Sequence, residues 1–83
     1  MPTTASAAKR LRQTRRRTLR NRAIRSRLRT SIKRARQAAA SGEREAAIAL
    51  FRGAVALIDR SASKGIIHPR TAARYKSRLA RAL

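Results

Sequence analysis

The side chains able to do acid–base or metal chemistry are few and scattered in this chain of 83 residues. It has no cysteine, one histidine (His68) and three carboxylates, Glu43, Glu45 and Asp59. Glu43 and Glu45 are closest in sequence, but residues two apart point in different directions on a helix. No Gly-rich phosphate loop accompanies them. We therefore expect no catalytic residues, no enzyme activity, no metal site, no cofactor and no small-molecule substrate.

Basic side chains are the abundant chemical group. The chain has 23 Lys and Arg against three acids, for a net charge of +20. Residues 1–40 hold 14 of these cations and no acid, residues 41–65 carry a net charge of +1, and residues 66–83 add +5. Such clustering matches the electrostatic footprint of a nucleic-acid binder. An anionic membrane surface is the competing polyanion, because a basic amphipathic helix would suit it too.

The cations of the first 40 residues form two groups. At about 100° per residue, one group lies on one side of a helix: Arg22, Arg25, Arg29, Lys33 and Arg36. The other points in many directions, which suits a rod between several phosphate backbones: Lys9, Arg10, Arg12, Arg15, Arg16, Arg17 and Arg20. His68, at a helix junction, either caps a turn or donates a hydrogen bond to a phosphate.

Length and hydropathy indicate one small domain, residues 1–83. No apolar run approaches the roughly 20 residues that span a bilayer, and no apolar stretch typical of a secretory signal opens the chain. We expect a soluble, intracellular protein without a membrane partner. Residues 1–30 are rich in Arg, Ser and Thr and free of acids, so a mitochondrial presequence is an alternative interpretation of that segment.

Hydrophobic periodicity predicts an all-α fold with three helices, at about residues 5–40, 43–64 and 69–83. In the first, a narrow apolar stripe comprises Ile24, Leu28, Ile32, Ala35 and Ala39. The stripe ends at Ile24, although nothing there breaks a helix. We therefore predict a three-helix bundle whose long N-terminal helix extends beyond the bundle as a basic arm.

The other two helices carry their own apolar faces. The second has a broad arc that predicts contact with both neighbours: Ala47, Leu50, Phe51, Ala54, Val55, Leu57, Ile58 and Ala62. The third places Ala72, Leu79 and Leu83 on one face, with Tyr75 and Lys76 at its margin. Gly42 and Gly65 are expected to end the first two helices with positive φ, and Ser41 is an alternative N-cap for the second.

The choice between DNA and RNA rests on weaker signals. No helix-turn-helix, zinc-finger or leucine-zipper pattern is visible, and there is no array of Asn or Gln suited to adenine edges. A straight basic helix fits a folded RNA in which several backbones converge. A basic helical protein that compacts DNA remains the alternative.

Four segments carry a resemblance to a known family. They are Ser6-Ala7-x-Lys9-Arg10-x-Arg12-Gln13, Leu19-Arg20-Asn21-Arg22-Ala23-Ile24-Arg25-Ser26, Lys64-Gly65-Ile66-Ile67-His68 and Thr71-Ala72-Ala73-Arg74-x-Lys76-Ser77-Arg78-Leu79. Together they resemble the bacterial small-subunit ribosomal protein number twenty. The resemblance implies a structural component of the small ribosomal subunit, in the cytoplasm or an organelle. It also implies direct binding to 16S ribosomal RNA that stabilises RNA folding during assembly, as a bridge between the 5′ domain and the penultimate stem.

The resemblance also implies which residues contact RNA. On the first helix these are Ser6, Lys9, Arg10, Arg12, Gln13, Arg20, Asn21, Arg22 and Arg25, and on the third they are Arg74, Lys76 and Arg78. Charge and position add Arg16, Arg17, Arg29, Lys33, Lys64 and His68 to the candidates. The chain departs from the family pattern at Pro69-Arg70, where an N-cap Asn is expected. Pro69 or Thr71 is then left to start the third helix.

Overall fold

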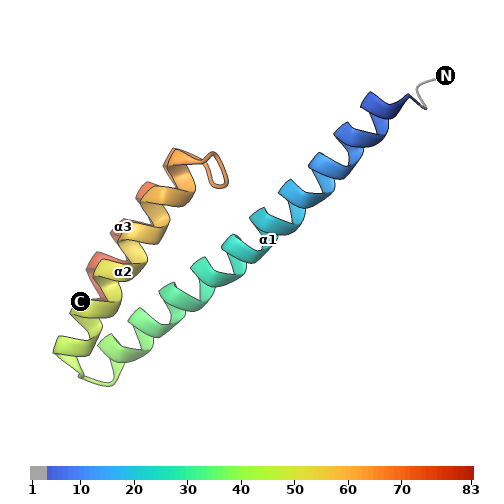
Figure 1. The fold of residues 1–83 in the computed structure, drawn as a ribbon. Coiled ribbons are helices and arrows are strands. Elements are labelled where there is room, and N and C mark those ends of the chain that lie inside the picture. Colours follow the sequence, from blue (N-terminus) through green and yellow to red (C-terminus); the bar gives the residue numbers. More distant parts are fainter. Residues whose placement is uncertain (1–3) are drawn as a thin grey trace.

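Three helices make up the fold of this computed structural model, which describes residues 4–83; residues 1–3 of the predicted domain lie outside the described residues. In chain order the helices are α1 (Ala5–Ala40), α2 (Arg44–Ser63) and α3 (Pro69–Ala82), and residues 4–83 contain no strand. Figure 1 shows α2 and α3 running beside the C-terminal half of α1, while the N-terminal half projects away alone. The all-α prediction is confirmed, with helix bounds within one residue of those expected.

Each helix begins differently. Thr4 caps α1 because its side-chain oxygen accepts a hydrogen bond from the N–H of Ala7 at 3.3 Å. His68 caps α3, and Pro69 occupies the first turn, where its missing N–H costs nothing. The start of α2 at Glu43 has no side-chain cap. The alternative of Ser41 as that cap is wrong, because its hydroxyl instead donates to the Ala38 carbonyl, 3.1 Å away.

Glycines end the first two helices, as predicted. Gly42 has φ of 79° and Gly65 has φ of 76°, the left-handed region that only glycine adopts without strain. After α2, the N–H of Gly65 donates to the Ala62 carbonyl at 3.0 Å, and that of Ile66 donates to the Ser61 carbonyl at 2.9 Å. This pattern satisfies two carbonyls at the helix end. It also turns Ile66 back onto the bundle, where it is 7% exposed.

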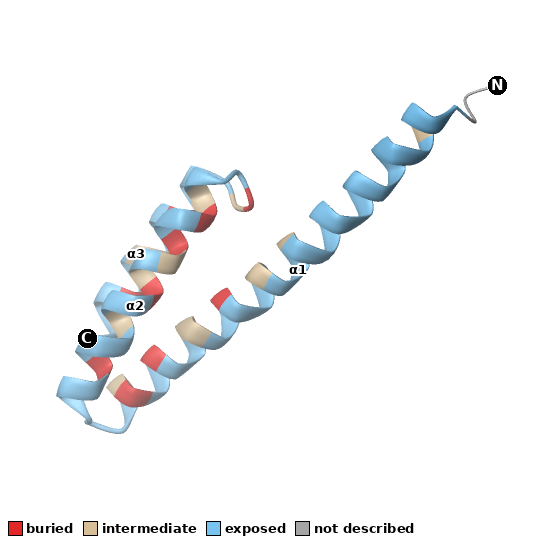
Figure 2. Ribbon diagram, in the orientation of Figure 1, coloured by how far each residue is buried: buried red, intermediate tan, exposed pale blue. Residues whose placement is uncertain are grey.

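The core lies between the C-terminal half of α1 and the two shorter helices (Figure 2). It is a cluster of buried apolar side chains from all three: Leu28, Ala35, Ala54, Ile58, Ala72 and Leu79. Helix α2 packs against both neighbours, as its broad apolar arc predicted. Ala38, which the stripe on the first helix did not include, is also buried.

Two leucines predicted to face the core do not lie in it. Leu83 is 51% exposed, because α3 ends beside the α1–α2 turn and Leu83 lies next to Gly42 and Arg44 there. Leu50 is 37% exposed, because it borders the side of the α1–α2 contact that α3 leaves open. Both lie on the expected helix face, but no neighbouring helix covers them there.

Residues 5–23 of α1, called the arm from here on, extend beyond the bundle. Every residue from Ala8 to Arg20 is exposed, and burial begins at Asn21 and Ile24. The described chain is accordingly elongated, with principal extents of 61 × 20 × 13 Å. The prediction of a long N-terminal helix that projects as a basic arm is confirmed.

Candidate nucleic-acid interface

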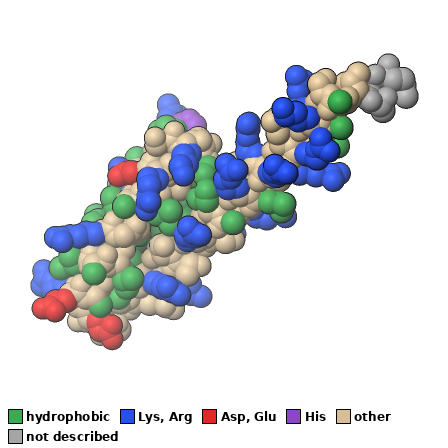
Figure 3. All heavy atoms as spheres, in the orientation of Figure 1, with side chains coloured by type: hydrophobic (Ala, Val, Ile, Leu, Met, Phe, Trp, Pro, Cys, Tyr) green, Lys and Arg blue, Asp and Glu red, His purple; other side chains and the backbone are tan. Residues whose placement is uncertain are grey.

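The arm concentrates positive charge on a helix with no acid nearby. It holds eight Lys or Arg and no Asp or Glu, and Figure 3 shows these side chains spread around it, away from the acidic ones. Within residues 4–83 the one ion pair joins Lys76 to Asp59, in the bundle. A helix that is polar all round and lacks side-chain ion pairs gains little stability from its own side chains. The positive charge of the arm is therefore not neutralised by any acidic side chain among residues 4–83.

Two rows of cations run along α1. The first was predicted from helical spacing: Arg22, Arg25, Arg29, Lys33 and Arg36. Its members after Arg22 line hollows together with Tyr75 of α3. The second falls within an arc of about 40° around the helix axis, at about 100° per residue: Lys9, Arg16, Arg20, Arg27 and Arg34. Sequence reasoning placed only the arm members of the second row among the candidates. The seven-residue spacings between its members were the signal for Arg27 and Arg34, which extend the row into the bundle.

Arg25 has a structural contact that the sequence did not predict. Its guanidinium donates a hydrogen bond to the carbonyl oxygen of Ile66 at 3.3 Å, joining α1 to the α2–α3 loop. The side chain remains largely exposed, and a guanidinium has five N–H donors. Arg25 can therefore hold the loop and still present donors to a phosphate.

Tyr75 of α3 lies beside the first cation row. A shallow hollow between α1 and α3 is lined by Arg29, Lys33 and Arg36 together with this tyrosine. The Tyr75 side chain is half-buried and packs against the core. The expectation that it sits at the core margin is confirmed.

The candidates on α3 do not share one face. Residues two apart on a helix differ by about 200°, so Lys76 lies opposite both Arg74 and Arg78. Lys76 Nζ is 2.9 Å from Asp59 Oδ1, so its charge is partly neutralised within the chain. Arg74 and Arg78 are exposed and have no acidic partner among residues 4–83.

His68 acts as the N-cap of α3. Its Nδ1 accepts a hydrogen bond from the N–H of Arg70 at 3.0 Å, which confirms the interpretation of the ring as a cap. In the neutral ring the other nitrogen, Nε2, then carries the proton and can donate. The phosphate contact therefore stays a prediction for an exposed side chain that already has a structural role.

The remaining candidates are distributed along the surface. Ser6, Gln13 and Lys64 are exposed, and Asn21 is half-buried where the arm meets the bundle. Among residues 4–83 no three His, Asp or Glu side chains gather as a metal ion would require. No helix in the same range is long and apolar enough to cross a membrane. The arrangement presents cations on the arm and on the bundle, which the continuous helix α1 joins.

Comparison with known proteins agrees with these features. The family model described as ribosomal protein S20 matches residues 2–83. Small ribosomal subunit protein bS20 of Nitrosomonas europaea is 53% identical over 83 residues, covering 100% of this chain and 95% of the relative. The bS20 proteins of Bordetella petrii (52% identical; 100% of this chain and 95% of the relative) and Thermomicrobium roseum (52% identical; 95% and 80%) are similar over comparable lengths. The chain belongs to the ribosomal protein S20 family.

Proposed function

We propose that this protein is a structural, non-catalytic component of the small ribosomal subunit that binds 16S ribosomal RNA directly and stabilises RNA folding during assembly. The observation that carries the proposal is the arm, whose eight cations have no acid beside them. Arginine dominates this set, and its planar guanidinium suits bidentate contacts with phosphate.

The proposed mechanism is electrostatic clamping of two RNA segments by the bundle and by one long helix whose arm is stabilised by the bound RNA. Helix α1 has 36 residues, and at about 1.5 Å per residue it is about 54 Å long. The arm makes up roughly half of that length, so it can bind a segment that the bundle does not reach. The cations on α3, with Arg74 and Arg78 foremost, would hold a second segment. Such a bridge fits the expected partners, the 5′ domain and the penultimate stem.

Competition binding separates this function from the alternatives. The full chain is titrated with a transcript of the 16S 5′ domain plus penultimate stem, against equal phosphate concentrations of duplex DNA and of anionic vesicles. We expect the folded RNA to compete best. Stronger competition by duplex DNA would favour the DNA-compacting alternative. Stronger competition by vesicles would favour a membrane-active protein.

A pair of matched substitutions tests the role of the arm. Arg20→Ala removes an exposed cation from the arm, and Arg52→Ala removes an exposed cation from the outer face of α2. Both leave the core untouched, so the unfolding temperature should not change. We expect only Arg20→Ala to weaken RNA binding substantially. Equal losses would mean that net charge, rather than the arm, determines affinity.

A further inference from the structure

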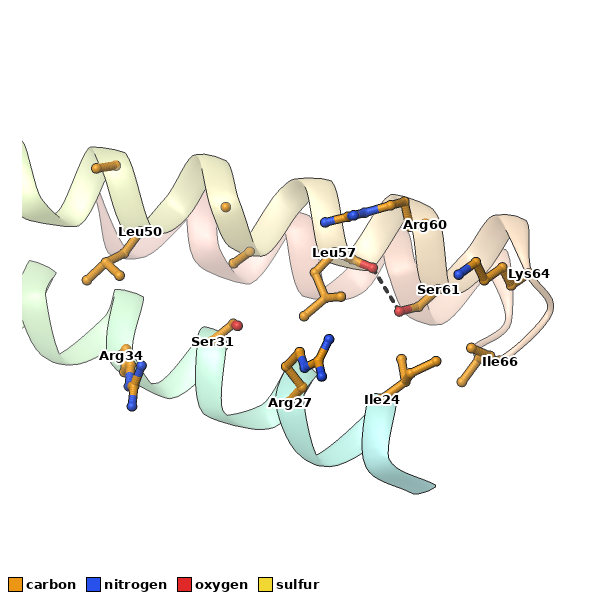
Figure 4. A pocket seen from close by; sticks show the side chains of 13 residues that line it. Ile24, Arg27, Ser31, Arg34, Leu50, Leu57, Arg60, Ser61, Lys64 and Ile66 are labelled. Atoms are coloured by element: carbon orange, nitrogen blue, oxygen red, sulfur yellow. Dashed lines mark hydrogen bonds between the residues drawn. The ribbon is translucent and has the colours of Figure 1, made fainter. Parts of the chain in front are cut away.

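A groove between α1 and α2 is left open by the position of α3. Its volume is about 390 Å³, and none of its lining residues comes from α3. Figure 4 shows side chains of α1 and α2 facing each other across it. Leu50 and Leu57 form part of an apolar floor, and Gly53 lies between them on α2. Four cations surround the floor: Arg27, Arg34, Arg60 and Lys64.

Gly53 is in the interior of α2, where glycine weakens a helix relative to alanine. Neither its backbone conformation nor close packing within residues 4–83 explains the glycine. Its φ is not positive, and a Cβ atom added at this position would meet no atom within 4 Å. Glycine is also the residue that lets a backbone approach a ligand closely. Gly53 therefore leaves space on the groove side of α2 that a group from outside the chain can approach closely.

The lining identifies the charge of this group. All the charged residues that line the groove are cations. Arg27 and Arg34 also continue the second cation row of α1, which begins on the arm with Lys9 and Arg16. A polyanion bound along the arm can therefore continue along the second cation row into the groove. An acidic protein segment confined to the groove would contact only the last two cations of that row.

We infer that the α1–α2 groove binds a single strand of RNA, with a sugar–phosphate unit packed over Gly53 and its phosphates between the flanking cations. This inference rests on the proposed function and assigns it a second surface, opposite α3. Ribose and base faces supply apolar area for Leu50 and Leu57, as single-stranded RNA does when its bases are unstacked. Phosphates supply the negative charge that the groove lacks.

Substitutions at Gly53 test the groove without removing a charge. Gly53→Ala should raise the unfolding temperature of the free protein by about 3–8 °C, because alanine favours the helix. It should also weaken binding of the 16S transcript, so stability and affinity move in opposite directions. Gly53→Leu should weaken binding by roughly tenfold or more and remove the protection of one RNA segment from hydroxyl radicals. Ala56→Leu, at an exposed position of α2 outside the groove lining, is the control and should change neither quantity.

The outcomes separate the groove from the general function. If wild-type protein fails to bind the transcript, the proposed function fails. If wild-type protein binds the transcript and Gly53→Leu binds it equally well, the groove is not an RNA site. An acidic protein segment is then the alternative ligand for the groove. An equal loss of affinity in Ala56→Leu would also overturn the inference, because added bulk elsewhere on α2 would then have the same effect as bulk in the groove.

Discussion

Leu79 lies in α3 and Leu83, four residues later, is the residue that follows its last turn, and we predict very different effects when each is replaced by alanine. The Leu79 side chain is 1% exposed, whereas Leu83 is 51% exposed. Truncation of a buried leucine costs about 2–5 kcal/mol, while a surface substitution usually changes stability by less than about 0.5 kcal/mol. Since about 1 kcal/mol shifts the unfolding temperature of a domain this size by roughly 4–8 °C, Leu79→Ala should lower it by at least ~8 °C. Leu83→Ala should lower it by less than ~4 °C.

The large effect follows from how little holds α3 in place. Its buried residues are Ala72 and Leu79, and a core of this size rarely supplies more than about 3–5 kcal/mol. At the upper end of the range, Leu79→Ala would therefore leave α3 undocked at room temperature. Thermal unfolding followed by far-UV circular dichroism measures the shift, and amide exchange over residues 69–82 reports whether α3 is docked. Equal losses in the two variants would refute the packing described for the end of α3.

Three further predictions concern a turn, an ion pair and the arm. Gly65→Ala should cost about 1–2 kcal/mol, because a Cβ atom disfavours the φ of 76°; thermal unfolding measures this, and an unchanged midpoint would contradict it. Asp59→Asn should cost less than about 1 kcal/mol, since its ion pair with Lys76 is half-exposed. The same change should leave RNA binding equal or tighter by titration, and weaker binding would count against Lys76 as an RNA contact. Amide exchange of residues 8–20 should be fast in the free protein and slow in the RNA complex, because nothing else neutralises the arm; equal protection in both would be the contrary result.

Local sequence signals predicted most of the fold. Helical periodicity was enough for three helices, and Gly42 and Gly65 marked the two stops because few other residues adopt positive φ. The arm was predictable because the apolar stripe ended at Ile24 while the helix pattern continued. The sequence did not predict how far the neighbouring helices cover each apolar helix face. Leu83 has the right spacing for the core, but its burial depends on how far the neighbouring helices reach.

The candidate interface was predictable in charge but not in arrangement. Net charge and its segregation indicated an anionic partner, and helical spacing identified the first cation row. The second role of Arg25 depends on a contact with Ile66, 41 residues later, which no local pattern reveals. Likewise, the groove beside Gly53 exists because α3 packs on the other side of α1 and α2. Both features arise from tertiary packing between segments distant in sequence.

The central claim is that cations on the arm and bundle clamp RNA phosphates, and the salt dependence of binding tests it most directly. If the interface neutralises about 6–10 phosphates, the affinity of the full chain for 16S ribosomal RNA should fall by about 10³ to 10⁵ between roughly 50 and 200 mM salt. A plot of the logarithm of the association constant against the logarithm of salt concentration should therefore be steep and linear. An affinity that stays constant across this range would contradict electrostatic clamping as the mechanism.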